Sequence, residues 1–154
     1  MSVIEPGTEV PEFKLQNAEG EPFTKADLLG KTTVLIFYPF AFSPGCTNQL
    51  TNYEEVIHEF EGRGAKLYAI STDPRWSQTA FKEQLGSSVE QLSDFEPKGA
   101  VAKAFGAYFE PAGMTHRALV VVGGDGVVKW SWLGETPGDV PGPERVHEGL
   151  DAAS

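Results

Sequence analysis

The sequence contains one cysteine, Cys46, and the residues before it define the setting in which its thiol would react. Ser43 is a favourable N-cap residue, and Pro44 suits the first position of a helix. Because proline also keeps the residue before it out of the helical conformation, a helix is expected to begin here. Cys46 then lies near the third helical position, among backbone N–H groups that have no helical acceptor.

A cysteine in this position is suited to nucleophilic chemistry. The free N–H groups and the helix dipole stabilise negative charge, so they favour the thiolate, which is the reactive form. The Ser43 hydroxyl is near enough in sequence to bond the sulfur or an approaching substrate. Gly45 leaves room for a substrate beside the backbone. The plain alternative is that Cys46 is a small buried apolar residue, as most lone cysteines are.

The segments around Cys46 predict the elements that hold it. Residues 34–38 form a continuous apolar run, typical of a central strand buried on both faces, and Pro39 is expected to end that strand. A helix over 47–60 and a strand over 66–71 follow. Strand, helix and strand predict a parallel pair of strands with a right-handed crossover.

The C-terminal half predicts an antiparallel hairpin. Strand-like segments at 118–122 and 127–132 flank a glycine-rich turn at 123–126. One α/β domain over residues 1–154 is expected, with no linker. The remaining predicted elements are a strand over 13–15, a one-turn helix at 24–30, helices over 77–85 and 100–105, a loop over 134–143 and a terminal helix over 144–153.

Composition excludes several classes of function. The net charge of −10 argues against nucleic acid and against anionic membrane surfaces. The longest apolar run, residues 34–42, is far shorter than the roughly 20 residues of a membrane span. Residues 1–6 show no signal peptide, so a cytoplasmic location is expected. One cysteine permits no internal disulfide, and three histidines without ligand spacing predict no metal site.

The spacing of Pro39, Ser43 and Cys46 resembles the active-site signature of the peroxiredoxins, Pro-x-x-x-(Thr/Ser)-x-x-Cys. Residues 6–13 are also similar to an N-terminal segment of that family. Residues 113–117, Gly-Met-Thr-His-Arg, resemble its single-cysteine alkyl hydroperoxide reductase E-like and bacterioferritin-comigratory groups. The resemblance implies a thioredoxin-like α/β fold, with a mixed central sheet flanked by helices.

The resemblance also implies a function. The chain would be a thiol-dependent peroxidase that reduces hydrogen peroxide and organic hydroperoxides through a sulfenic acid on Cys46, without a cofactor. Arg117, just before a predicted strand, matches the arginine that the family places beside the sulfur. The alternative for Arg117 is a solvated charge at a strand end. Ser43 would assist the leaving oxygen, and Pro39 would shield the pocket.

Two departures from the family pattern affect these expectations. Thr51 stands where related chains often carry a second cysteine, so the resolving thiol must come from outside, from a small thiol or a thioredoxin- or glutaredoxin-like protein. Gln49 replaces a usual glutamate, and its amide is still able to bond an arginine. The family also implies a homodimer. Phe40 and Phe42 would line the pocket mouth or cover the dimer contact.

Other interpretations stay open at this point. His116 would tune substrate binding, although a solvent-facing histidine at a strand end is the simpler expectation. A peroxide-sensing relay or a holdase on the same scaffold would share the sulfenic acid but turn over slowly. A thioredoxin-type disulfide exchanger is disfavoured because Cys-x-x-Cys is absent. A non-catalytic binding module would not depend on Cys46.

Overall fold

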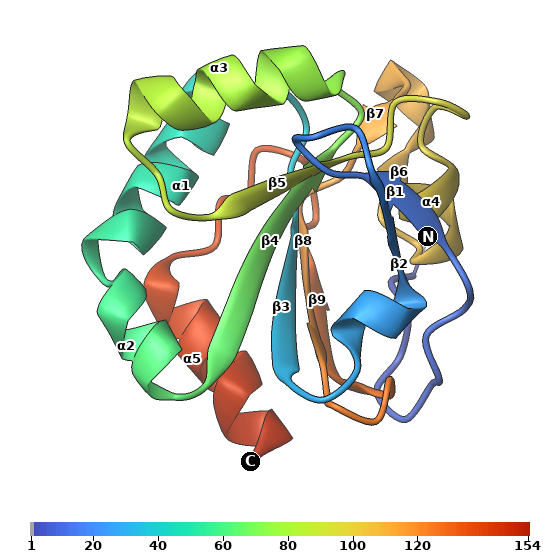
Figure 1. Ribbon diagram of the computed structural model, residues 1–154, viewed down its shortest axis with the longest axis vertical. Coiled ribbons are helices and arrows are strands. Elements are labelled where there is room, and N and C mark those ends of the chain that lie inside the picture. The colour runs from blue at the N-terminus through green and yellow to red at the C-terminus, as the bar shows by residue number, and fades with distance from the viewer. Residues whose placement is uncertain (1) are drawn as a thin grey trace.

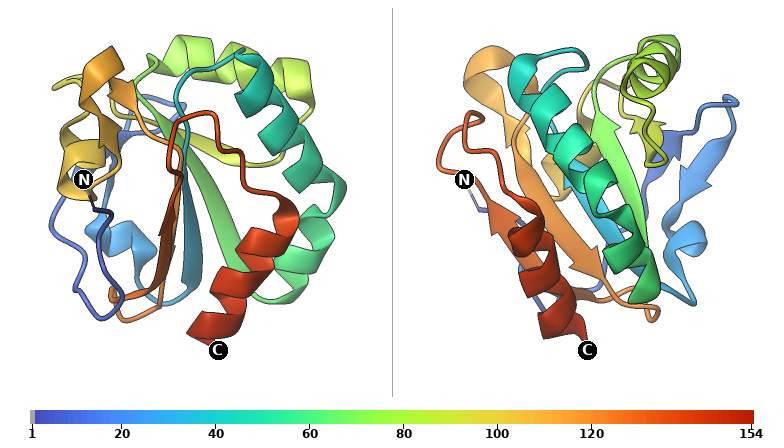
Figure 2. Two further views of the ribbon diagram at one scale, coloured as in Figure 1. Left: turned by 180° about the vertical axis from the view of Figure 1, so that it is seen from behind. Right: turned by 90° about the vertical axis from the view of Figure 1, so that its left-hand side faces the viewer.

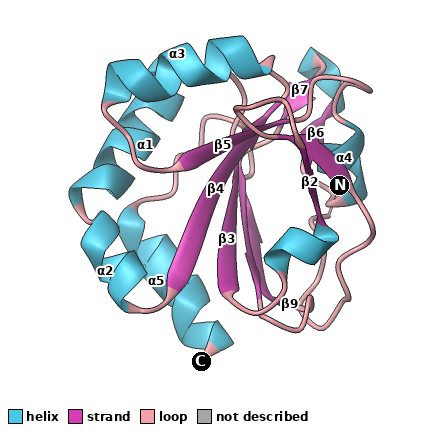
Figure 3. Ribbon diagram, in the orientation of Figure 1, coloured by secondary structure: helices cyan, strands magenta, loops and turns pink. Residues whose placement is uncertain are grey.

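The computed structural model describes residues 2–154 and shows a seven-stranded mixed sheet with helices on both faces (Figures 1 and 3). The strands lie in the order β2-β1-β5-β4-β3-β8-β9. The sheet strands are β1 (Lys14–Gln16), β2 (Pro22–Thr24), β3 (Thr32–Phe37), β4 (Ala65–Ser71), β5 (Glu90–Ser93), β8 (Ala118–Val122) and β9 (Val128–Leu133). The other elements are α1 (Pro44–Glu55), α2 (Ile57–Gly62), α3 (Arg75–Leu85), α4 (Ala100–Ala104), α5 (Pro143–Ala153), the 3₁₀ turns η1 (Lys25–Leu28) and η2 (Glu110–Ala112), and a short pair β6 (Tyr108–Phe109) and β7 (Met114–Thr115).

Strand β3 lies inside the sheet, between β4 and β8, and nearly all of its side chains are buried on one face or the other. Val34 and Ile36 join the core beneath α1, α2, α3 and α5, whereas Leu35 and Phe37 join the core beneath α4 and η1. Alternate side chains of one strand therefore pack against both helical layers. Figure 2 shows the two layers from two further sides. β3 pairs in parallel with β4 and antiparallel with β8.

The predicted βαβ unit and the predicted hairpin are both confirmed, with differences at their edges. The helix begins at Pro44, where the Ser43–Pro44 pair predicts it and three residues before the pattern over 47–60, and it is interrupted at Val56, whose φ of −121° lies outside the helical region. Val56 donates to the carbonyl of Tyr53, three residues back, so the chain tightens there before α2 begins. A β-branched residue is a weak helix former, which agrees with the position of the break.

Strand β5 was not predicted, and it introduces a buried carboxyl group. Asp94, directly after β5, is 5% exposed and accepts N–H bonds from Val101 (3.1 Å) and Ala102 (2.8 Å). These donors lie in the first turn of α4, so Asp94 caps that helix from outside it. Burial raises the pKa of Asp94 to about 6, although the two N–H bonds oppose this shift.

The raised pKa of Asp94 predicts a pH-dependent stability. Because the folded value lies above the unfolded value of 3.8, the folded state holds the proton more tightly. The free energy of unfolding is expected to fall as the pH rises from 3.8 to about 6, by about 3 kcal/mol from this group. Urea unfolding between pH 4 and 7 measures it. In Asp94→Asn this fall in the free energy of unfolding should be absent, whereas Glu12→Gln, which changes an exposed carboxyl, should retain it. Equal pH slopes in wild type and Asp94→Asn would refute the assignment.

Candidate active site

Cys46 is the third residue of α1, as its sequence position predicts. Ser43 is the N-cap, with extended backbone, and its Oγ accepts the Cys46 N–H at 3.3 Å. Pro44 occupies the first helical position, where its missing N–H costs nothing. The Cys46 side chain is fully buried at this helix end. Because Ser43 Oγ acts as the acceptor in this bond, its hydroxyl hydrogen remains available to a substrate.

Arg117 is brought to the sulfur by the sheet. It directly precedes β8, whose first residue, Ala118, pairs with Phe37 at the end of β3. The chain leaves β3 at that end and reaches Cys46 nine residues later, so both residues lie at one edge of the sheet. The Nη1 of Arg117 lies 3.1 Å from the Sγ of Cys46. The alternative of a solvated strand-end charge is wrong, because Arg117 is 3% exposed.

The other partners of the Arg117 guanidinium are neutral. Its Nη1 donates to Gln49 Oε1 at 2.9 Å, and its Nε donates to the carbonyl of Pro137 at 3.0 Å. Among residues 2–154, the ion pairs within 4.0 Å include none to this guanidinium. This buried cation therefore has no carboxylate partner among the described residues, and the Cys46 sulfur is one of the few groups that face it.

A second layer of hydrogen bonds was missed by sequence reasoning. Gln49 Nε2 donates to the hydroxyl of Tyr53 at 3.1 Å, and that hydroxyl donates to the carbonyl of Pro141 at 2.9 Å. The segment 134–142 therefore binds the site at two carbonyls, those of Pro137 and Pro141. The apolar periodicity of the helix indicates only a core position for Tyr53. The available signal was its spacing of four residues from Gln49, which places the two side chains side by side.

The loop between β3 and α1 is held by a carboxylate from the segment that connects β4 to α3. Asp73, just after β4, accepts the N–H of Ala41 at 2.8 Å and the Ser71 hydroxyl at 2.7 Å. Pro39 is buried within this loop, and the β3 strand ends just before it, as predicted. Phe42 adopts a φ of +72°, which few non-glycine residues do. This conformation changes the direction of the chain just before α1 begins.

The remaining predicted site residues lie farther from the sulfur, or in surroundings other than those expected from the sequence. A Cβ on Gly45 would lie 3.0 Å from an Arg117 nitrogen, so the structure places the guanidinium, rather than open space, beside this glycine. Phe40 and Phe42 are 44% and 46% exposed, and the Phe42 ring packs on Phe81. His116 does not face solvent, which corrects that expectation.

The burial of His116 has a structural cause. Its ring packs edge-on against Phe109, and its Nδ1 accepts the N–H of Arg117 at 2.7 Å. Burial lowers the pKa of His116 and favours the neutral ring, which is the form that accepts this bond. The contacts of His116 are thus with the backbone that carries Arg117, not with the sulfur.

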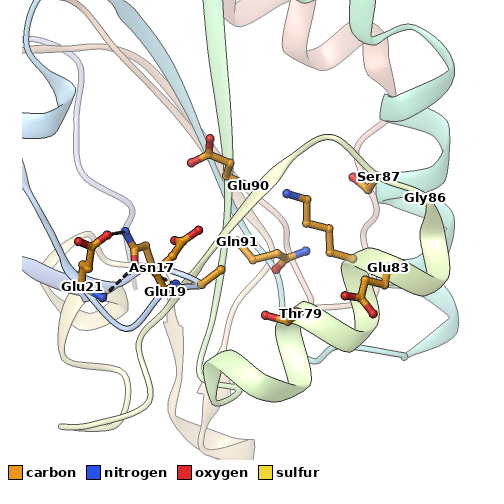
Figure 4. A pocket seen from close by; sticks show the side chains of 11 residues that line it. Asn17, Glu19, Glu21, Thr79, Glu83, Gly86, Ser87, Glu90 and Gln91 are labelled. Atoms are coloured by element: carbon orange, nitrogen blue, oxygen red, sulfur yellow. Dashed lines mark hydrogen bonds between the residues drawn. The ribbon is translucent and has the colours of Figure 1, made fainter.

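A pocket of about 680 Å³ lies elsewhere, between the β1–β2 turn and the C-terminal end of α3 (Figure 4). The residues that line it include Glu19, Glu83, Glu90 and Gln91. Cys46 and its hydrogen-bond partners do not line it. This pocket is therefore separate from the buried sulfur.

The arrangement at Cys46 suits attack on a small electrophile that carries an oxygen leaving group. A nucleophilic sulfur at a helix N-terminus adjoins a fixed guanidinium and a free hydroxyl hydrogen. Such donors stabilise charge that develops on a departing oxygen, and they need no reorganisation in a site without bulk water.

Comparisons with known proteins agree with this chemistry. The family model described as "AhpC/TSA family" matches residues 6–131. Alkyl hydroperoxide reductase E of Mycobacterium tuberculosis (strain ATCC 25618 / H37Rv) is 32% identical over 135 residues, which cover 87% of this chain and 88% of that protein. Alkyl hydroperoxide reductase C of Amphibacillus xylanus is 31% identical over 135 residues, covering 84% of this chain and 71% of that protein.

Solved structures show the same fold. AhpC of Enterococcus faecalis superposes with a TM-score of 0.85 at 26% identity, over 99% of this chain and 92% of that one. Peroxidoxin BcpB of Mycobacterium tuberculosis gives a TM-score of 0.81 at 28% identity, over 97% and 96% of the two chains. The thioredoxin-like fold class inferred from the sequence is therefore confirmed.

Proposed function

Since the chain belongs to the AhpC/TSA family, that of the peroxiredoxins, we propose that it reduces hydroperoxides through Cys46, with Arg117 as the residue that activates the sulfur and orients the peroxide. The observation that carries the proposal is the 3.1 Å contact between Arg117 Nη1 and Cys46 Sγ in the first turn of α1. The family supports peroxidase activity, and this contact supports the assignment of roles.

The proposed reaction is an in-line displacement at oxygen. The Cys46 thiolate attacks the nearer oxygen of ROOH, an S–O bond forms, and the O–O bond breaks. The leaving alkoxide or hydroxide takes a proton and departs as alcohol or water, so the thiol is oxidised to a sulfenic acid and the peroxide is reduced. Arg117 and the Ser43 hydroxyl stabilise the charge that develops on the leaving oxygen. Pro39 and Gly45 shape the backbone around the sulfur.

The sulfenic acid has to be reduced by an external thiol, because the sequence contains no second cysteine. That thiol condenses with the sulfenic acid to a mixed disulfide and releases water. A further thiol then exchanges with the disulfide and regenerates Cys46. Since Cys46 is fully buried, a protein thiol reaches it only after the first turn of α1 opens. A small thiol needs a smaller opening.

The assembly and location of the protein are also proposals. Family resemblance supports a homodimer, and a cluster of exposed aromatic side chains near the site offers a surface for it: Phe40, Phe42 and Trp76. The bond from Ala41 to Asp73 holds the first two beside the N-terminal end of α3, where Trp76 lies. Within residues 2–154, the helices are all too short or too polar to cross a bilayer. We place the protein in the cytoplasm.

Stopped-flow kinetics test the proposed function. The purified protein is mixed with hydrogen peroxide or an organic hydroperoxide, and sulfenic acid formation is followed with a chemical trap and intact mass. A rate far above that of free cysteine is expected. Steady turnover with a small thiol or a thioredoxin-like protein supports the peroxidase, whereas a fast first oxidation without turnover supports a sensor or holdase. A rate equal to that of free cysteine contradicts both.

A further inference from the structure

Gln49 lies between two buried partners and bonds each with a different end of its amide. Its Oε1 accepts from Arg117 Nη1 at 2.9 Å, and its Nε2 donates to the Tyr53 hydroxyl at 3.1 Å. The exposed fractions are 1% for Gln49, 3% for Arg117 and 0% for Tyr53. Bulk water therefore does not reach these two bonds in the folded protein.

The direction of each bond follows from which atoms are able to donate. A guanidinium has donors only, so the carbonyl end of Gln49 must face Arg117. The amide nitrogen then faces Tyr53, whose oxygen must accept. The hydroxyl hydrogen of Tyr53 is left to point elsewhere, and it meets the carbonyl of Pro141, which only accepts. Burial raises the pKa of Tyr53, so this hydrogen stays in place.

We propose that Tyr53 is a positioning residue for the peroxidase reaction: it fixes the amide of Gln49 so that the carbonyl holds Arg117 against Cys46. The inference rests on the proposed function. Without the Tyr53 hydroxyl, one orientation of the Gln49 amide leaves its buried NH₂ group without an acceptor. The other orientation turns that NH₂ group toward the guanidinium, which also has only donors. Arg117 then loses the single orientation that a fixed neighbour imposes.

The same reasoning explains why glutamine at this position needs a tyrosine. A carboxylate presents acceptors on both oxygens and has no donor to satisfy, so it would hold Arg117 in either orientation. A glutamate side chain here would therefore not depend on Tyr53, whereas the amide of Gln49 does. In this chain, the hydrogen bonds from Pro141 through Tyr53 to Gln49 thus hold Arg117 in place, where the charge of a glutamate would do so without them.

A set of four proteins tests the proposal: wild type, Tyr53→Phe, Gln49→Glu and the double variant. The rate of Cys46 sulfenic acid formation with hydrogen peroxide is the readout. Tyr53→Phe is expected to slow the wild-type reaction by roughly fivefold, the effect of one neutral hydrogen bond. In the Gln49→Glu protein, the same change is expected to alter the rate by less than about twofold, because there is no amide to orient.

The control is Tyr38→Phe, which removes another buried tyrosine hydroxyl that donates a hydrogen bond, here to Gln91 at 2.6 Å. It should leave the rate near that of wild type. Equal slowing by Tyr53→Phe in the wild-type and Gln49→Glu backgrounds would overturn the proposal, as would a wild-type rate in Tyr53→Phe or equal slowing by Tyr38→Phe. If Tyr53→Phe folds poorly, Gln49→Glu should restore its melting temperature, and failure to do so counts against the proposal. A slow wild-type reaction would instead contradict the proposed function itself.

Discussion

Replacing Cys46 with serine is expected to abolish sulfenic acid formation and peroxide turnover. The sequence holds no other cysteine, so no thiol remains to be oxidised. A serine hydroxyl is not ionised near neutral pH, and the neighbouring guanidinium does not make it a nucleophile toward peroxide. The measurement is intact mass after treatment with hydrogen peroxide and a sulfenic acid trap, alongside peroxide consumption with an added thiol. Wild type should gain one trap adduct and the variant none.

The adduct, rather than a gain of one oxygen atom, is the decisive signal. Met1 and Met114 also take up oxygen from peroxide, and they do so in both proteins. Thermal melting of Cys46→Ser is expected to show that the fold persists, because the substitution nearly conserves volume at a fully buried site. Turnover at the wild-type rate in this variant would show that another group reduces the peroxide, and the assignment of Cys46 would fail.

Replacing Arg117 with methionine is expected to slow the reaction with peroxide by roughly 100-fold or more, while peptide mapping still finds the adduct on Cys46. Methionine keeps much of the buried side-chain volume but removes the donor at 3.1 Å from the sulfur. It also removes the positive charge beside the sulfur. Arg117→Lys is expected to recover only part of the rate, because a lysine provides the charge without the planar set of donors.

Arg145→Ala serves as the matched control for Arg117→Met. Arg145 is partly exposed at the start of α5 and pairs with Glu148 at 3.2 Å, without a bond to the site. Its loss should leave the peroxide rate unchanged, since an exposed ion pair of this kind contributes little. A wild-type rate in Arg117→Met would remove this residue from the mechanism. An equal loss in both variants would point to a general effect of net charge.

Much of the fold was predictable because its signals are local. Proline after serine marks the start of α1, and a run of apolar residues marks a strand buried on both faces. The glycine-rich segment at 123–126 marks the turn of the hairpin. Strand β5, Glu-Gln-Leu-Ser, has a single apolar residue and gives no such signal. It is a strand because its backbone pairs with β4 in the assembled sheet.

The sequence alone determined where the thiol sits in its helix, that it has no partner cysteine, and that an arginine precedes a late strand. Only the tertiary structure decided that Arg117 and Gln49, 68 residues apart, meet at that thiol, that His116 is buried, and that Tyr53 reaches the carbonyl of Pro141 88 residues later. Caps and turns are set by interactions within a few residues. Contacts across such separations depend on how the strands are ordered and on which side chains the core leaves in reach, and neither is encoded in a local pattern.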